Sequence, residues 1–118
     1  MDTLAPGSLL AQVRPANTTA ATAVTASVSN TEITAIHVCN TSGAVRKARI
    51  FHDNDGSTYD ETTALYWDVA VPADSTLEIN NESGMSGIVL LKDGTLGVRT
   101  DSANGLTFSI YGLVSRQR

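Results

Sequence analysis

The stretch EITAIHVCNTSGAVRKARIFHDNDG, residues 32–56, decides the expected fold. It contains two runs in which Ile, Val and Phe alternate with polar residues, which is the pattern of half-buried β-strands. The turn formers NTSG at 40–43 separate the two runs, and DNDG at 53–56 ends the second. The sequence therefore predicts a β-hairpin with strands at 33–39 and 45–52.

The side chains of these two runs indicate which faces are buried. Both faces of 33–39 are partly apolar, so we expect this strand to be central in its sheet. In the second run, Ala48, Ile50 and His52 share one face, which we expect to point to the core. Outward along the chain, the run ALYWDVAV at 64–71 alternates in the same way, and we expect Trp67 to anchor the core.

The rest of the chain repeats the rhythm of short apolar runs and turn residues. Further strands are expected at 8–13, 18–28, 75–80, 88–91, 96–99 and 106–114. Asp93-Gly94, between 88–91 and 96–99, is the strongest short-range signal for a second hairpin. The pattern predicts an all-β chain, an antiparallel β-sandwich or jelly roll of about eight short strands.

The length of 118 residues fits one domain with its own core. We expect residues 1–14 to be an N-terminal arm followed by a first edge strand, because Pro15 is tolerated beside an edge strand and not in a central one. Residues 15–118 are expected to form the β-sandwich.

Composition argues against several classes of protein. The net charge is −4 with scattered basic residues, so direct binding to nucleic acid is not expected. No run approaches 18 apolar residues and no secretory signal begins the chain, so we expect no membrane segment. A single cysteine, Cys39, excludes a disulfide within the chain and fits assembly in a reducing cytoplasm.

Two groups of residues invite a metal-binding interpretation. The segment from Asp53 to Asp55 offers carboxylates that a calcium ion would bind, yet its spacing does not fit an EF-hand loop, and an acidic turn is the better interpretation. His37 and His52 lie on the two strands of the predicted hairpin, but no third zinc ligand has a suitable spacing. Cys39 has no assignable catalytic partner. We expect no metal, no cofactor and no enzymatic activity.

Several segments together resemble small structural proteins of tailed-bacteriophage virions. They are IHVCN at 36–40, ARIF at 48–51, LYWDV at 65–69, PADSTL at 72–77, LKDG at 91–94 and TFSIYG at 107–112. The resemblance spans about residues 15–114 and consists of strands and turns without a chemical signature.

The resemblance implies a capsid decoration or cement protein, in which a β-sandwich stabilises the expanded capsid by bridging capsomers. It implies the major phage capsid protein as partner, a homo-oligomer such as a dimer or trimer, and a location in the virion after assembly in the bacterial cytoplasm. Because aromatic residues are enriched in interface cores, we expect contacts from the arm and from three tyrosines. These candidate interface residues are Met1, Leu4, Pro6, Tyr59, Tyr66 and Tyr111.

Two alternatives remain open. The chain fits a neck or tail adaptor or a fibre module of a phage, which would be present in few copies per particle. It also fits a carbohydrate-binding β-sandwich module, which would need an exposed aromatic platform, whereas most of the six aromatic residues are expected in strand cores.

Overall fold

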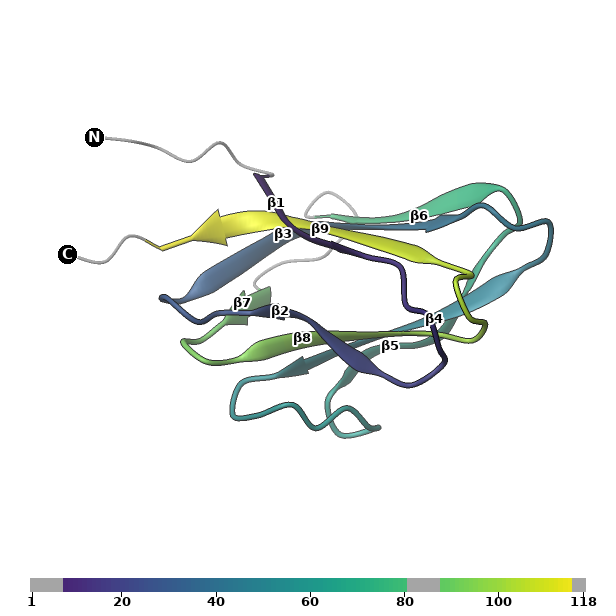
Figure 1. The fold of residues 1–118 in the computed structure, drawn as a ribbon. Helices are drawn as coiled ribbons and strands as arrows, with labels where there is room; N and C mark the ends of the chain where they lie inside the picture. The colour runs from purple at the N-terminus through teal and green to yellow at the C-terminus, as the bar shows by residue number, and fades with distance from the viewer. Residues whose placement is uncertain (1–7, 81–87, 116–118) are drawn as a thin grey trace.

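The computed structural model describes residues 8–80 and 88–115, which form two packed antiparallel sheets (Figure 1). Sheet A contains β1 (Ser8–Val13), β3 (Thr31–Asn40), β6 (Ser75–Asn80), β7 (Ile88–Leu90) and β9 (Thr107–Val114). Sheet B contains β2 (Ala21–Thr25), β4 (Arg46–Asp53), β5 (Ala64–Val71) and β8 (Thr95–Thr100). This confirms the expected all-β sandwich. Within the described ranges, no helix is long and apolar enough to span a membrane.

The strand pairing is that of a jelly roll. The order in sheet A is β1-β9-β3-β6, with β7 also paired to β3, and the order in sheet B is β2-β8-β4-β5. Because β6 pairs with residues 35–40 of β3 and β7 with residues 31–33, the two together form one interrupted edge strand. The strands are then nested in pairs: β1 with β9, β2 with β8, β3 with the interrupted strand β6–β7, and β4 with β5. This nested order places the first and last strands side by side.

The predicted hairpin of residues 32–56 is wrong, because β3 and β4 lie in different sheets. The hairpin predicted around Asp93-Gly94 is also wrong, since β7 belongs to sheet A and β8 to sheet B. A tight turn does form there, and the Gly94 N–H donates to the Leu91 carbonyl oxygen at 2.6 Å. Turn residues specify that the chain reverses; they do not specify whether the next strand pairs in the same sheet or crosses to the opposite one.

A buried asparagine holds the crossing between β3 and β4. Asn40 is 1% exposed, and its Nδ2 lies 2.8 to 3.1 Å from the carbonyl oxygens of Ala44, Val71 and Pro72. Its Oδ1 accepts hydrogen bonds from the backbone N–H and the hydroxyl of Ser42. The side chain therefore joins the β3–β4 connection to the start of the β5–β6 connection, the neighbouring crossing at this end of the sandwich.

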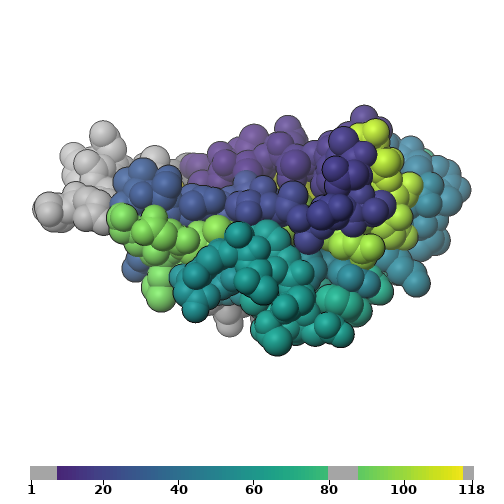
Figure 2. All heavy atoms as spheres, turned by 60° about the horizontal axis from the view of Figure 1, so that its bottom comes forward, coloured from purple at the N-terminus to yellow at the C-terminus, as the bar shows by residue number. Residues whose placement is uncertain are grey.

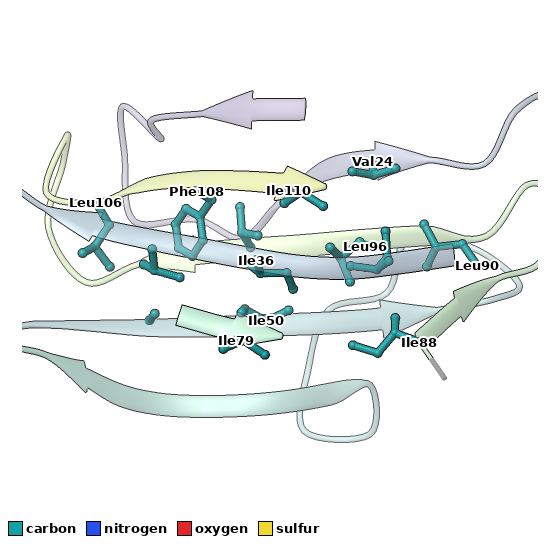
Figure 3. Close-up of a cluster of buried hydrophobic side chains, with 14 of the residues drawn as sticks. Val24, Ile36, Ile50, Ile79, Ile88, Leu90, Leu96, Leu106, Phe108 and Ile110 are labelled. Atoms are coloured by element: carbon teal, nitrogen blue, oxygen red, sulfur yellow. The ribbon is translucent and has the colours of Figure 1, made fainter. Parts of the chain in front are cut away.

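The core lies between the two sheets, and its side chains come from alternate positions on both (Figure 3). As predicted, Ala48 and Ile50 are fully buried, whereas His52 is half-buried. Burying each large apolar side chain contributes about 1.5–3 kcal/mol. The largest fully buried side chains of this core are Phe108, Ile33, Ile36, Ile50, Leu90, Leu96, Leu106, Ile110, Val38, Val71 and Val98; Phe51 is equally buried but lies outside this cluster.

Candidate interaction surface on sheet B

Trp67 does not anchor the core. The simple alternation in β5 places Trp67 inside, but its side chain is on the outer face of sheet B and is 42% exposed. Tyr66 instead packs against the core cluster. The expectation for Trp67 is therefore wrong. Its ring is instead the largest exposed aromatic surface in the part of the chain that the structure describes.

A β-bulge causes this reversal. Ala48 pairs with Val69 and Ile50 pairs with Tyr66. Between these two pairs β4 has one residue, Arg49, whereas β5 has two, Trp67 and Asp68. Asp68, in that interval, has a φ of 55°, a left-handed conformation that Asp tolerates better than most residues. The extra residue shifts the inward and outward positions of the strand by one, which moves Trp67 to the outer face.

The ring of Trp67 is held by neighbours from β4 and β5. The Arg49 guanidinium carbon lies 3.6 Å from the ring centroid, and the ring of Phe51 meets Trp67 edge-on at 6.3 Å between centroids. Arg49 is fixed in turn by Asp68, through Nε–Oδ1 at 2.6 Å and a second nitrogen to Oδ2 at 3.1 Å. A bidentate ion pair and a cation–π contact thus fix the exposed indole in one orientation.

The connection between β4 and β5 covers the other side of this cluster. Phe51 points to the outer face of sheet B, yet it is only 1% exposed, because Tyr59 packs on it at 5.6 Å between centroids. The Tyr59 hydroxyl donates to Thr95 Oγ1 at 2.8 Å and lies 2.6 Å from Thr22 Oγ1. Figure 2 is turned toward this side, and the teal segment around residue 60 stands out on it.

The absence of a side chain at Gly97 makes room for Tyr59. A Cβ at this position would lie 2.6 Å from the Tyr59 ring. Gly97→Ala is therefore expected to displace the ring and lose its hydroxyl contacts, and to lower the free energy of unfolding by about 2 kcal/mol. Denaturant unfolding measures this change. Gly43→Ala, where a Cβ meets nothing within 4 Å, is the control, and an equal loss in both variants would contradict the role of Gly97.

The Arg49–Asp68 pair predicts a pH dependence. Hydrogen bonds from the Arg49 guanidinium lower the pKa of Asp68, so the folded carboxyl binds its proton more weakly than the unfolded one. Its contribution to stability is complete above the unfolded pKa of about 3.9 and is lost as the pH falls through the lower folded pKa.

We expect the free energy of unfolding to fall less between about pH 6 and pH 3 in Asp68→Asn than in the wild type, because the variant lacks this titration. Asn also tolerates the positive φ, so the bulge is retained. The fluorescence of Trp67, the single tryptophan, reports unfolding beside the substitution. Glu78→Gln, on β6 of the other sheet, is the control; if it flattens the pH dependence as much as Asp68→Asn does, the ion pair is not the cause.

The structure distributes the predicted interface residues over the molecule. Tyr59 belongs to the cluster on sheet B, Tyr66 faces the space between the sheets, and Tyr111 lies on sheet A with its ring 5.4 Å from that of His37. Met1, Leu4 and Pro6 lie outside the described residues. No single face therefore contains the three tyrosines, and their role in an interface stays a prediction.

The acidic segment after β4 forms a turn. The Asp53 carboxylate accepts the N–H groups of Asp55 at 3.0 Å and Thr58 at 2.8 Å. These bonds lower the pKa of Asp53, whereas the neighbouring Asp53 carboxylate raises the pKa of Asp55. The Asp53 carboxylate therefore serves to hold the loop that carries Tyr59.

The predicted neighbours His37 and His52 lie on strands of different sheets. His37 packs on Tyr111, and His52 Nε2 lies 3.0 Å from Asn54 Oδ1. Cys39 is a half-buried free thiol. In residues 8–80 and 88–115, no three His, Cys, Asp or Glu residues are grouped to hold a metal ion.

Sequence reasoning missed Arg49, Trp67 and Asp68 as a unit, because the bulge that joins them has no clear local signal. Comparisons with protein-family models, with curated proteins and with solved structures found no match. The resemblance to phage structural proteins therefore rests on the sequence pattern alone and stays a prediction.

Proposed function

We propose that this chain is a non-enzymatic structural protein of a bacteriophage virion, which decorates the capsid and bridges neighbouring capsomers. The observation that carries the proposal is the exposed Trp67, fixed on the outer face of sheet B by Arg49 and Asp68. Tryptophan and arginine are the residues most enriched in the energetic centres of protein interfaces. A rigid indole loses little conformational entropy on binding, which favours affinity.

The sequence resemblance and the jelly-roll fold both support a role in a virion. The sequence segments that resemble phage virion proteins supply the class of partner, the major capsid protein. By analogy of fold, viral capsid and lectin domains, among others, also use the jelly roll. In this proposal the protein assembles in the bacterial cytoplasm, acts as a dimer or trimer, and remains in the virion.

The proposed mechanism is mechanical. Packaged DNA presses the shell outward, and a protein that contacts two capsomers adds binding free energy only where the expanded lattice presents both sites. A specific interface buries about 800 Å² per partner. Because many copies engage a repeated lattice, modest individual affinities combine into a strong total effect.

Exposed Trp67 also favours a second candidate, a carbohydrate-binding module, because such modules need an exposed aromatic ring. Its ring is partly occupied, since the Arg49 guanidinium lies against one face. The test is binding of the full chain to a panel of immobilised glycans. Binding that Trp67→Ala abolishes would favour a carbohydrate-binding module over the capsid proposal.

The deciding experiment is the copy number of the protein in purified virions, measured by quantitative mass spectrometry against the major capsid protein. A ratio of the same order as the capsid protein is expected. A handful of copies would instead favour a neck or tail adaptor or a fibre module, and absence from virions would overturn the virion proposal.

A further inference from the structure

Three cationic side chains gather on the outer face of sheet B. Lys47 and Arg49 are two residues apart on β4, and Arg49 pairs directly with Arg99 on β8. The alternate β8 residues Val98 and Thr100 are fully buried, so Arg99 points outward, away from the core. Like charges directly opposite each other in a sheet repel, so this arrangement costs stability in the isolated chain.

The chain neutralises this group only in part. Asp68 forms an ion pair with Arg49 and attracts Lys47 and Arg99 from a greater distance, and Glu61 attracts Arg49 in the same way. Arg99 Nε donates to the Thr18 carbonyl oxygen at 2.7 Å, which places the guanidinium without neutralising its charge. Within the part of the chain that the structure describes, neither Lys47 nor Arg99 has a carboxylate within ion-pair distance.

A local excess of positive charge therefore surrounds an exposed tryptophan in a chain whose net charge is −4. We call Lys47, Arg49, Trp67 and Arg99 the cationic patch. Its composition, an aromatic centre with arginines beside it, is that of a protein-binding surface. Because the patch is positively charged, a complementary binding surface would be negatively charged.

We propose that the cationic patch docks on a carboxylate-rich protein surface, whose Asp and Glu side chains pair with Lys47 and Arg99 around an apolar contact on Trp67. This inference rests on the proposed function and names the chemistry of the partner's contact surface. A second copy docking through the same face would place like charges together, so the patch does not fit a symmetric self-contact. A nucleic acid is disfavoured because three cations engage few phosphates and the rest of the chain is acidic.

The first test measures binding of the full chain to purified virions assembled without it. Lys47→Glu and Arg99→Glu are each expected to weaken binding about tenfold, and binding of the wild type is expected to weaken with added salt. Lys92→Glu reverses a charge outside the patch and is the matched control, expected to bind like the wild type. Equal binding by the patch variants and the control would overturn the inference while leaving a capsid function intact.

Two further measurements keep the result interpretable. Arg99→Lys retains the charge and is expected to bind nearly as well as the wild type; a tenfold loss in this variant would assign the effect of Arg99→Glu to lost structure and overturn the electrostatic role. The second measurement compares a Glu-rich synthetic peptide, single-stranded DNA and an oligogalacturonate as probes of the free protein. Binding of the peptide, weakened by Arg99→Glu, is expected.

Binding of the DNA or the oligogalacturonate without the peptide would overturn the assignment to a protein partner. The peptide measurement needs no virion, so it tests the chemistry of the patch even where the protein proves absent from particles. Failure of the proposed function and failure of this inference are thereby distinguished.

Discussion

Asn40→Asp is expected to lower the free energy of unfolding by about 3–5 kcal/mol, a large part of the total stability of a domain this size. Nδ2 of Asn40 faces three carbonyl oxygens from the connections at one end of the sandwich. A carboxylate has no hydrogen to donate, so the substitution places a buried negative charge against these oxygens. The expected cost combines lost hydrogen bonds with the burial of an unpaired charge.

Denaturant unfolding at neutral pH measures the effect. Asn17→Asp is the matched control, because the Oδ1 of exposed Asn17 accepts the Thr19 N–H, and a carboxylate accepts the same bond. The control is expected to change stability by less than about 0.5 kcal/mol. If Asn40→Asp cost no more than the control, the connection between the layers would not depend on this side chain. Asn40→Ala, with an intermediate loss, separates the missing bonds from the added charge.

The strands of this fold could be predicted from sequence, but their assignment to sheets could not. Alternating apolar residues mark β3, β4 and β9, and the burial of Ala48, Ile50, Phe108 and Ile110 follows that alternation. The connections at 41–45 and 91–94 carry the turn residues of hairpins, yet both cross between sheets. A crossing is decided by long-range contacts such as those of Asn40 with Val71 and Pro72, which no local pattern contains.

The cluster of Arg49, Trp67 and Asp68 could not be predicted from sequence either, because it also depends on a long-range contact. Unbroken alternation through β5 predicts a buried Trp67. The residue that interrupts alternation is Asp68, an aspartate at positive φ, and nothing in the neighbouring sequence demands that conformation. The bulge is supported by a contact with another strand, the Arg49–Asp68 ion pair. The most exposed aromatic side chain of the described fold therefore depends on an interaction between residues 19 positions apart.

Trp67→Ala is expected to weaken binding of the protein to virions about 100-fold, which corresponds to about 2.7 kcal/mol. The side chain is already 42% exposed, and the Arg49–Asp68 pair does not require the indole, so we expect the variant to fold. Truncation removes the apolar contact and leaves Arg49 without its cation–π partner. The loss should appear mainly in the dissociation rate, as is usual for changes at the centre of an interface.

A surface substitution elsewhere decides whether this effect belongs to the outer face of sheet B. Leu9 on β1 is 53% exposed and lies on the other sheet, so Leu9→Ala is expected to bind virions as the wild type does. Trp67→Phe keeps an aromatic ring over Arg49 and is expected to retain most of the affinity. If Leu9→Ala lost binding while Trp67→Ala did not, the contact would lie on sheet A. The bulge at Asp68 would then serve only to twist the edge strand β5 away from pairing with another chain, which is another established use of bulges.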